Sequence, residues 1–340
     1  MSALAVLWFF LIFVLIAGYF VLDGFDLGVG VLYRTLAKTD AERALVRRSI
    51  GPVWDGNEVW LLTAGGALFA AFPAAYATTF SGFYLAVMLV LFGLIVRAVS
   101  LEFGAHDPKW GRVWDACFTV GSFLPALLLR VALGNVIAGV PLAANGDYAG
   151  VPLLGLLSPF TLVVGALGFA MCMAAGAAWV ALKTERASAV HERAETQRRV
   201  WHVVALALFA VATVLAFAVV KPQFASGMLG AGVVFAIAFV ACIAVSILQA
   251  KKGNDLAAFV LQSVAAVCLV ALAAVSLFPN LVVATPGSVG ESITLMNAAS
   301  SDTSLAWMTG IACIGVPLVL VYHMIAYRVF SGRLAEEDVA

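Results

Sequence analysis

Long apolar stretches, separated by short polar segments, follow one another along the whole of this 340-residue chain. A helix needs about 20 predominantly apolar residues to cross a lipid bilayer, and nine stretches approach or exceed that length. They predict an all-α, polytopic membrane protein in which residues 1–340 form a single integral membrane domain. The predicted helices span residues 4–33, 53–73, 77–101, 113–140, 155–182, 200–220, 227–250, 256–279 and 304–330.

Composition supports this class of protein. Hydrophobic residues make up 64% of the chain and charged residues 11%, whereas an ordinary soluble domain is about 25% charged. The formal net charge is zero, so there is no excess of basic residues to indicate a nucleic-acid partner. The five cysteines lie singly in apolar segments without a CxxC motif, so they are expected to be buried apolar side chains rather than disulfides.

Lysine and arginine are concentrated in alternate loops, and this distribution predicts the orientation in the membrane. Basic clusters follow the predicted helices 1, 3, 5, 7 and 9, whereas Arg130 and Lys221 are the exceptions. By the positive-inside rule, the N-terminus lies outside and the C-terminus lies in the cytoplasm. The first cytoplasmic loop contains a capping-box pattern, Thr39 followed by Glu42, which predicts a short surface helix.

Carboxylates within the predicted spans are the main functional signal. An ionised carboxylate in hydrocarbon costs at least about 2.5–3.5 kcal/mol, so it marks a proton or ion path, a ligand or a buried ion pair. The predicted orientation brings the polar ends of four helices to the same inner boundary. The resulting cluster comprises Asp23, Asp26, Asp55, Asn57, Glu58, Arg97 and Asp115, with Glu102 just past the third helix.

Two interpretations of this cluster remain open. A hydrated acidic cluster that opens to the cytoplasm is what proton uptake needs. Alternatively, Asp23 or Asp26 pairs with Arg97 and fixes two helices together, while Asp55 caps the start of its helix. Because the acids outnumber the single arginine within the spans, some carboxylates must be protonated, hydrated or paired with another subunit.

No redox centre, catalytic residue or metal site is predicted in this chain. Haem iron in membrane subunits needs axial ligands such as His or Met within the bilayer. The run Met171-Cys172-Met173 fits an apolar core better than a set of soft ligands. The four histidines form no evident inward-facing pair; they are His106, His191, His202 and His323.

Five segments together resemble subunit II of the cytochrome bd quinol oxidases. They follow in order from the first helix to the last, so the resemblance covers nearly the whole chain, and WDGNEVW followed by TAGGALFAAFP is its most specific part. The segments are LDGFDLGVG (22–30), PVWDGNEVWLLTAGGALFAAFP (52–73), FSGFYLAVMLVL (80–91), GNVIAGVP (134–141) and SLFPNLVVA (276–284).

The resemblance implies two four-helix bundles with a peripheral ninth helix, in the inner membrane of a bacterium. It implies a heterodimer with a haem-bearing subunit I, which carries two b-type haems and one d-type haem, and it leaves room for small single-helix subunits. That complex oxidises quinol at the outer face and reduces dioxygen to water with protons from the cytoplasm, which charges the membrane without pumping. A structural quinone or lipid in this chain is compatible with the resemblance.

The family's aspartate in the WDGN motif falls on Asp55, and the acidic residue after the third helix falls on Glu102. With Glu58, these residues form the expected proton path, although some relatives have Gln at the position of Glu58. Arg97 matches the family's helix 3 arginine. Arg130 departs from the apolar residue expected there, and its side chain is expected to snorkel outward.

Two rival functions use the same residues. A proton-coupled transporter would usually show broken helices near mid-membrane and an inverted repeat, whereas the charges here lie at one edge. A purely structural subunit would have every carboxylate passively paired.

Overall fold

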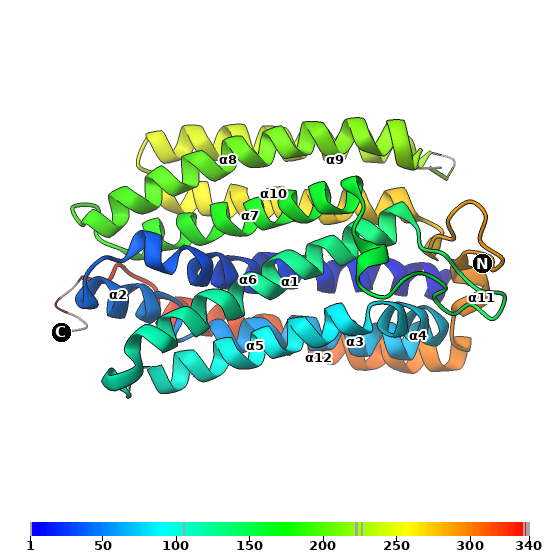
Figure 1. The fold of residues 1–340 in the computed structure, drawn as a ribbon, viewed down its shortest axis with the longest axis horizontal. Helices are drawn as coiled ribbons and strands as arrows, with labels where there is room; N and C mark the ends of the chain where they lie inside the picture. The colour runs from blue at the N-terminus through cyan, green and yellow to red at the C-terminus, as the bar shows by residue number, and fades with distance from the viewer. Residues whose placement is uncertain (1, 105, 222–223, 226, 336, 338–340) are drawn as a thin grey trace.

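The computed structural model describes residues 2–104, 106–221, 224–225, 227–335 and 337. Long helices lie side by side in an elongated bundle, and the two termini lie at opposite ends of it (Figure 1). We call these the α2 end, which holds the C-terminus, and the α11 end, which holds the N-terminus. The long helices are α1 (Ala3–Leu36), α3 (Trp54–Ala71), α5 (Tyr84–Gly104), α6 (Gly111–Ala138), α7 (Pro159–Lys183), α8 (Ala189–Leu215), α9 (Met228–Lys251), α10 (Asp255–Leu277) and α12 (Asp302–Val329).

Each of the nine predicted stretches overlaps one of these helices, with one interruption, and α8 begins at Ala189, well before the predicted start at residue 200. The stretch predicted as 77–101 covers the second part of α4 (Pro73–Gly82), which begins at a proline, and most of the separate helix α5. In the described part of the chain, eight helices are long and apolar enough to cross a membrane. The 18-residue α3 is not among them, because polar residues fill its first turns. The all-helical membrane fold is confirmed, whereas the count of nine crossings stays a prediction.

Helix α1 lies at the centre and packs against α3, α6, α7 and α10. Its closest approach is to α7, where the backbones of Gly28 and Gly176 meet. A Cβ atom on Gly28 would lie 1.9 Å from the carbonyl oxygen of Cys172, so only glycine permits this crossing. Beside it, the Phe25 ring stacks on Trp179 with centroids 4.3 Å apart. Helix α1 thus joins four other long helices, and the division into two four-helix bundles stays a prediction.

The short surface helix α2 (Asp40–Ile50) confirms the capping-box prediction. The Thr39 hydroxyl accepts the Glu42 backbone N–H, and the Glu42 carboxylate accepts the N–H of Thr39 and of Lys38. Glu42 also pairs with Arg193 of α8. Burial tends to raise the pKa of the Glu42 carboxyl, but these hydrogen bonds outweigh burial and lower the pKa below its ordinary value.

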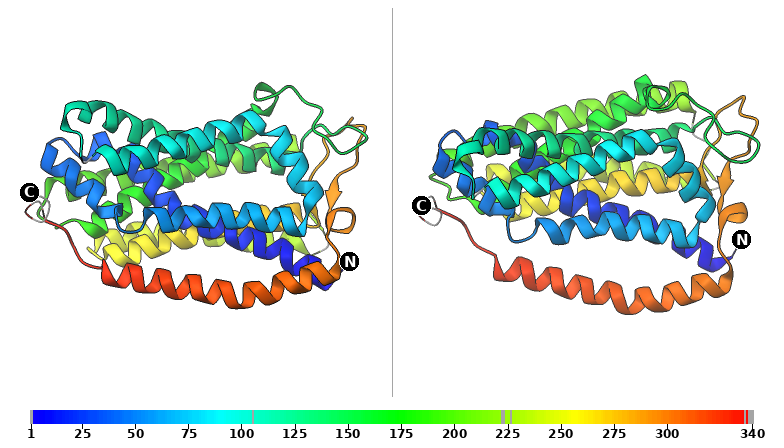
Figure 2. Two further views of the ribbon diagram at one scale, coloured as in Figure 1. Left: turned by 90° about the horizontal axis from the view of Figure 1, so that it is seen from below. Right: turned by 60° about the horizontal axis from the view of Figure 1, so that its bottom comes forward.

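Helix α12 lies at the edge of the bundle and is anchored at both ends (Figure 2). Near the α11 end, the Trp8 indole N–H donates to Thr309 Oγ1 at 3.0 Å. At the α2 end, the Leu334 N–H donates to the Lys183 carbonyl at 2.7 Å. The remaining elements are small: a two-stranded antiparallel sheet of β1 (Asn280–Val282) and β2 (Ile293–Thr294), α11 (Leu295–Ala298), 3-10 turns at Pro108–Trp110 and Leu154–Leu156, and a π-helical turn at Ala216–Val220.

Candidate functional site

Arg97 of α5 is fully buried at the centre of the predicted polar cluster. Its Nη1 atom lies 2.7 Å from Asp23 Oδ1 of α1 and 2.7 Å from Glu58 Oε1 of α3. Helix α5 reaches this position because it crosses α6 closely: a Cβ atom on Gly121 would lie 2.7 Å from the Arg97 backbone nitrogen. One guanidinium therefore joins α1, α3 and α5, as the pairing interpretation of Asp23 predicts.

Asp26 is also fully buried, one turn further along α1. Its Oδ2 atom accepts a hydrogen bond from Asn57 Nδ2 at 2.7 Å, and Tyr327 of α12 donates its hydroxyl to Asn57 Oδ1 at 2.9 Å. Within the described residues, no cation lies within 4.0 Å of Asp26. Sequence reasoning missed Tyr327, because nothing in the chain alone shows that the last helix contacts α3 near its C-terminal end. We call Asp23, Asp26, Asn57, Glu58 and Arg97 the Arg97 cluster.

Asp55 and the partly exposed Glu58 connect the buried members of this cluster to the protein surface. Asp55 is exposed in the first turn of α3, where its Oδ1 accepts the N–H of Gly56 at 2.6 Å. The Glu58 side chain, one turn later, is 24% exposed and reaches inward to Arg97. Carboxylates thus pass from exposed Asp55 through half-buried Glu58 to fully buried Asp23.

Glu102 lies on the surface near the end of α5, five residues after Arg97. Its backbone carbonyl contacts His106 Nδ1 at 3.1 Å. No ion pair joins the Glu102 carboxylate to any residue that the structure describes. Both expected outer members of the path, Asp55 and Glu102, are therefore open at the α2 end.

Asp115 belongs to a different ion pair, and the expectation that it joins the cluster is corrected. Its Oδ1 atom lies 2.5 Å from Arg47 Nη2 and its Oδ2 atom 3.7 Å from Arg43 Nε, both on α2. These arginines lie outside the predicted spans. The comparison of acidic and basic residues within the spans therefore did not include them. Asp115 holds α2 against α6.

The expectation that Arg130 snorkels outward is wrong. Its side chain is 2% exposed, and its guanidinium carbon lies 4.3 Å from the centre of the Phe20 ring on α1. The side chain turns inward because Gly168 of α7 leaves room for it: a Cβ atom there would lie 2.2 Å from Arg130 Cγ.

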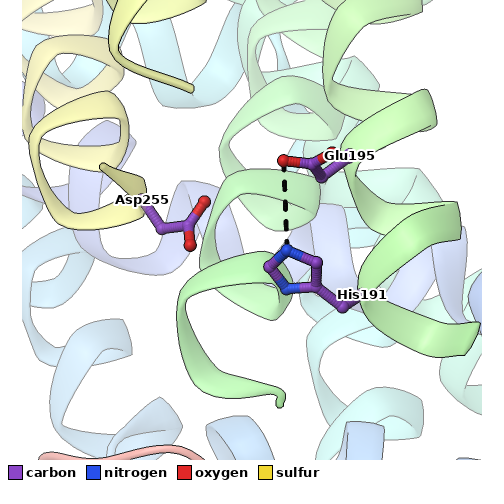
Figure 3. Close-up of side chains that lie close together, drawn as sticks. All are labelled: His191, Glu195 and Asp255. Carbon is purple, nitrogen blue, oxygen red and sulfur yellow. Dashed lines mark ion pairs between the residues drawn. The ribbon is translucent and has the colours of Figure 1, made fainter. Parts of the chain in front are cut away.

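One group of potential metal ligands occurs within the described residues: His191, Glu195 and Asp255, whose ligand atoms lie within 4.8 Å of one another (Figure 3). Arginines already form ion pairs with the carboxylates of Glu195 and Asp255. Asp255 lies 2.7 Å from Arg333 and 3.4 Å from Arg198, which also contacts Glu195 at 3.2 Å. The positive charge of these arginines disfavours the binding of a metal cation. We therefore interpret the group as an ion-pair network that connects α8, α10 and the C-terminal segment.

Two other histidines make hydrogen bonds between helices inside the bundle. His202 Nε2 lies 2.7 Å from Gln262 Oε1, and Gln262 donates to the Met171 carbonyl at 3.2 Å. His323 Nε2 accepts the Trp60 indole N–H at 3.3 Å. These contacts give each ring a role in joining helices.

The arrangement of the helices defines the class of protein. The structure of the bd oxidase from Geobacillus thermodenitrificans matches this one with a TM-score of 0.79, over 97% of this chain and 99% of that chain, at 14% sequence identity. The fold is therefore that of a chain of a bd oxidase. The family model described as "Cytochrome bd terminal oxidase subunit II" matches residues 4–330, and the chain belongs to that family.

Two curated relatives match this chain over nearly the full length of both sequences. Subunit 2 of the cytochrome bd-I ubiquinol oxidase of Escherichia coli K12 is 34% identical, over 99% of this chain and 97% of the relative. Subunit 2 of the cytochrome bd ubiquinol oxidase of Bacillus subtilis is 32% identical, over 99% of both chains. The chain is thus an integral inner-membrane protein and one subunit of an oxidase complex.

Proposed function

We propose that this chain is the accessory subunit of a quinol:oxygen oxidoreductase and carries protons from the cytoplasm toward a haem-bearing subunit I. The observation that carries the proposal is the passage of carboxylates from exposed Asp55 through Glu58 to buried Asp23. Glu102 forms part of the entry at the surface, Asp55 carries the protons onward, and Glu58 receives them at the edge of the Arg97 cluster. The partner holds two b-type haems and one d-type haem, and dioxygen is reduced to water there.

The proposed orientation places the α2 end in the cytoplasm. The termini lie at opposite ends of the bundle, which requires an odd number of crossings (Figure 1). Eight helices meet the length and hydropathy criteria within the described residues, and α3 supplies the ninth crossing. The basic residues of α2 and of the segment after α12 then face the cytoplasm, as the positive-inside rule expects. Electrons from quinol oxidised outside and protons taken up inside would charge the membrane without pumping.

The surface of α3 and α5 is the proposed contact with subunit I. Beyond the exposed Asp55, α3 exposes Leu62 and Phe69, and α5 exposes Phe92 and Ile95. Lipid would cover the apolar side chains well but solvates a carboxylate poorly, whereas a protein partner can supply hydrogen bonds or water to it. Docking on this face would bring Asp55 and Glu58 against the partner and would stabilise both subunits.

The rival transporter function finds less support in the helices. In the described residues of the central helices α1, α6 and α7, the helical backbone is continuous, although α6 contains Pro125. The unwound segments at mid-membrane that transporters use to coordinate a substrate are not seen in these helices.

The test is replacement of Asp55 by Asn in the assembled complex. Asn keeps the size and hydrogen-bonding groups but cannot exchange a proton, so Asp55→Asn should assemble with normal haem content and lose most quinol oxidase turnover, by about ten-fold or more. Asp40→Asn is the matched control, because Asp40 is exposed at the same end and lies in the first turn of α2. Full turnover of an assembled Asp55→Asn complex would refute the proton path, and failure to assemble would favour the structural alternative.

A further inference from the structure

A cavity of about 340 Å³ lies between α1 and the helices α6 to α10, apart from the Arg97 cluster. Its size falls within the range of small-molecule sites, about 300–1,000 Å³. Apolar side chains form most of its lining, which includes Val233 and Ile237 of α9 and Phe217 beyond the end of α8. These three side chains are largely exposed on the membrane-facing surface, so the cavity opens sideways to the lipid.

Among the residues that the structure describes, Arg130 is the one charged residue in the lining of this cavity. Its Nη1 atom donates to the Pro125 carbonyl at 3.1 Å, whereas its buried Nη2 atom has no hydrogen-bond partner among the described residues. No carboxylate that the structure describes lies within 4.0 Å of the guanidinium, and the nearby Asp23 is already paired with Arg97. The Phe20 ring attracts the charge without neutralising it.

A buried guanidinium with an unpaired N–H beside an apolar cavity is suited to an anion that carries an apolar chain. The geometry points to a binding site for a fatty-acid-like amphiphile, with its carboxylate on Arg130 and one acyl chain in the cavity. A diacyl phospholipid fits less well, because Arg130 lies eight residues, or roughly 12 Å, from the end of α6 at Ala138. That depth is below the headgroup layer, and the volume suits one chain.

The polar neighbours of the cavity do not compete for this carboxylate. Gln262, which also lines the cavity, accepts a hydrogen bond from His202 and donates to the Met171 carbonyl. Its amide is therefore satisfied, and Arg130 alone selects the headgroup. The site does not depend on the proposed proton path, so the two can fail separately.

The test uses the whole purified complex in nanodiscs and a stearic acid that bears a photoreactive diazirine in its chain. Cross-links should map to lining residues of α7 and α9. Arg130→Met should reduce labelling about ten- to hundred-fold, as expected for losing a charged hydrogen-bonded partner. Arg112→Met is the matched control, because Arg112 is exposed on the same helix and outside the cavity, and its labelling should equal that of the wild type.

Competition on the wild-type complex tests the headgroup without any substitution. Unlabelled palmitate should displace the probe, whereas methyl palmitate, which has the same chain but no charge, should displace it at least ten-fold less effectively. Equal competition by the methyl ester or by a long-chain quinone would overturn the proposal, because a neutral ligand would then suffice. Undiminished labelling of Arg130→Met would overturn it as well. If that variant does not accumulate, Arg130→Lys should retain labelling, and the competition experiment decides.

Discussion

Replacing Arg97 by Met removes the cation that holds Asp23 and Glu58 together while keeping an unbranched apolar stem of similar length. The structure allows the cost to be worked out. Arg97 and Asp23 are completely buried and their charged atoms lie 2.7 Å apart, so the substitution leaves a buried carboxylate without its partner. Breaking such a pair costs about 3–5 kcal/mol. Glu58 adds less, because its side chain is 24% exposed and can be rehydrated.

The assay is the apparent melting temperature of the purified complex at a fixed scan rate, because complexes of this size rarely unfold reversibly. Arg97→Met should lower it by roughly 5–10 °C. The double variant Arg97→Met with Asp23→Asn should recover at least half of that loss, because no unpaired charge then remains on α1. Arg112→Met, at an exposed position, should change little. Equal melting temperatures of Arg97→Met and the wild type, or a double variant worse than the sum of its single variants, would refute the reasoning.

Three further predictions follow from the positions of single side chains. Glu102→Gln should lower quinol oxidase turnover less than Asp55→Asn does, and Glu102→Asp should be tolerated; the reverse order would mean that the path does not run from Glu102 to Asp55. The pKa of Glu42 is lowered in the folded protein, so its stabilising effect is complete above the unfolded pKa and is lost as the pH falls through the folded value. Glu42→Gln should therefore destabilise the complex at neutral pH and flatten the loss of stability in acid, as thermal unfolding from pH 7 to pH 3 would show. Cysteines introduced at the exposed Val289 should react with an impermeant maleimide from outside the cell, and those at the exposed Ala187 only after lysis; the opposite pattern would reverse the orientation.

The sequence predicts the helices well, because the length of apolar stretches is a direct response to the thickness of the bilayer. It also predicts the Arg97 cluster, because three-residue spacing and a common orientation bring those side chains to one depth. The same reasoning fails where the partner lies outside the spans. Asp115 pairs with Arg47 of the surface helix α2. The sequence pattern predicts that α2 exists, but it does not show which helix α2 packs against.

Contacts that depend on helix packing could not be predicted from the chain. The inward turn of Arg130 requires a gap at Gly168, and nothing in the sequence shows that α6 and α7 cross at that residue. The hydrogen bond from Tyr327 to Asn57 likewise requires α12 to lie against α3, although most of α12 faces outward. In both cases the polar side chain is visible in the sequence, and only the fold shows what it contacts.

The contrast between the carboxylates of this chain bears on the choice between a proton path and a structural subunit. Where the chain uses a buried carboxylate to hold helices together, it supplies arginines in excess: Asp115 lies within 4.0 Å of two arginines, and Asp255 of three. The Arg97 cluster does the opposite, since one guanidinium serves three carboxylates within the described residues: it contacts Asp23 and Glu58, and no cation lies within 4.0 Å of Asp26. A structural role would be served better by the arrangement at Asp255. An excess of carboxylates beside the surface instead attracts protons and gives them more than one place to bind, as an uptake path at the α2 end requires.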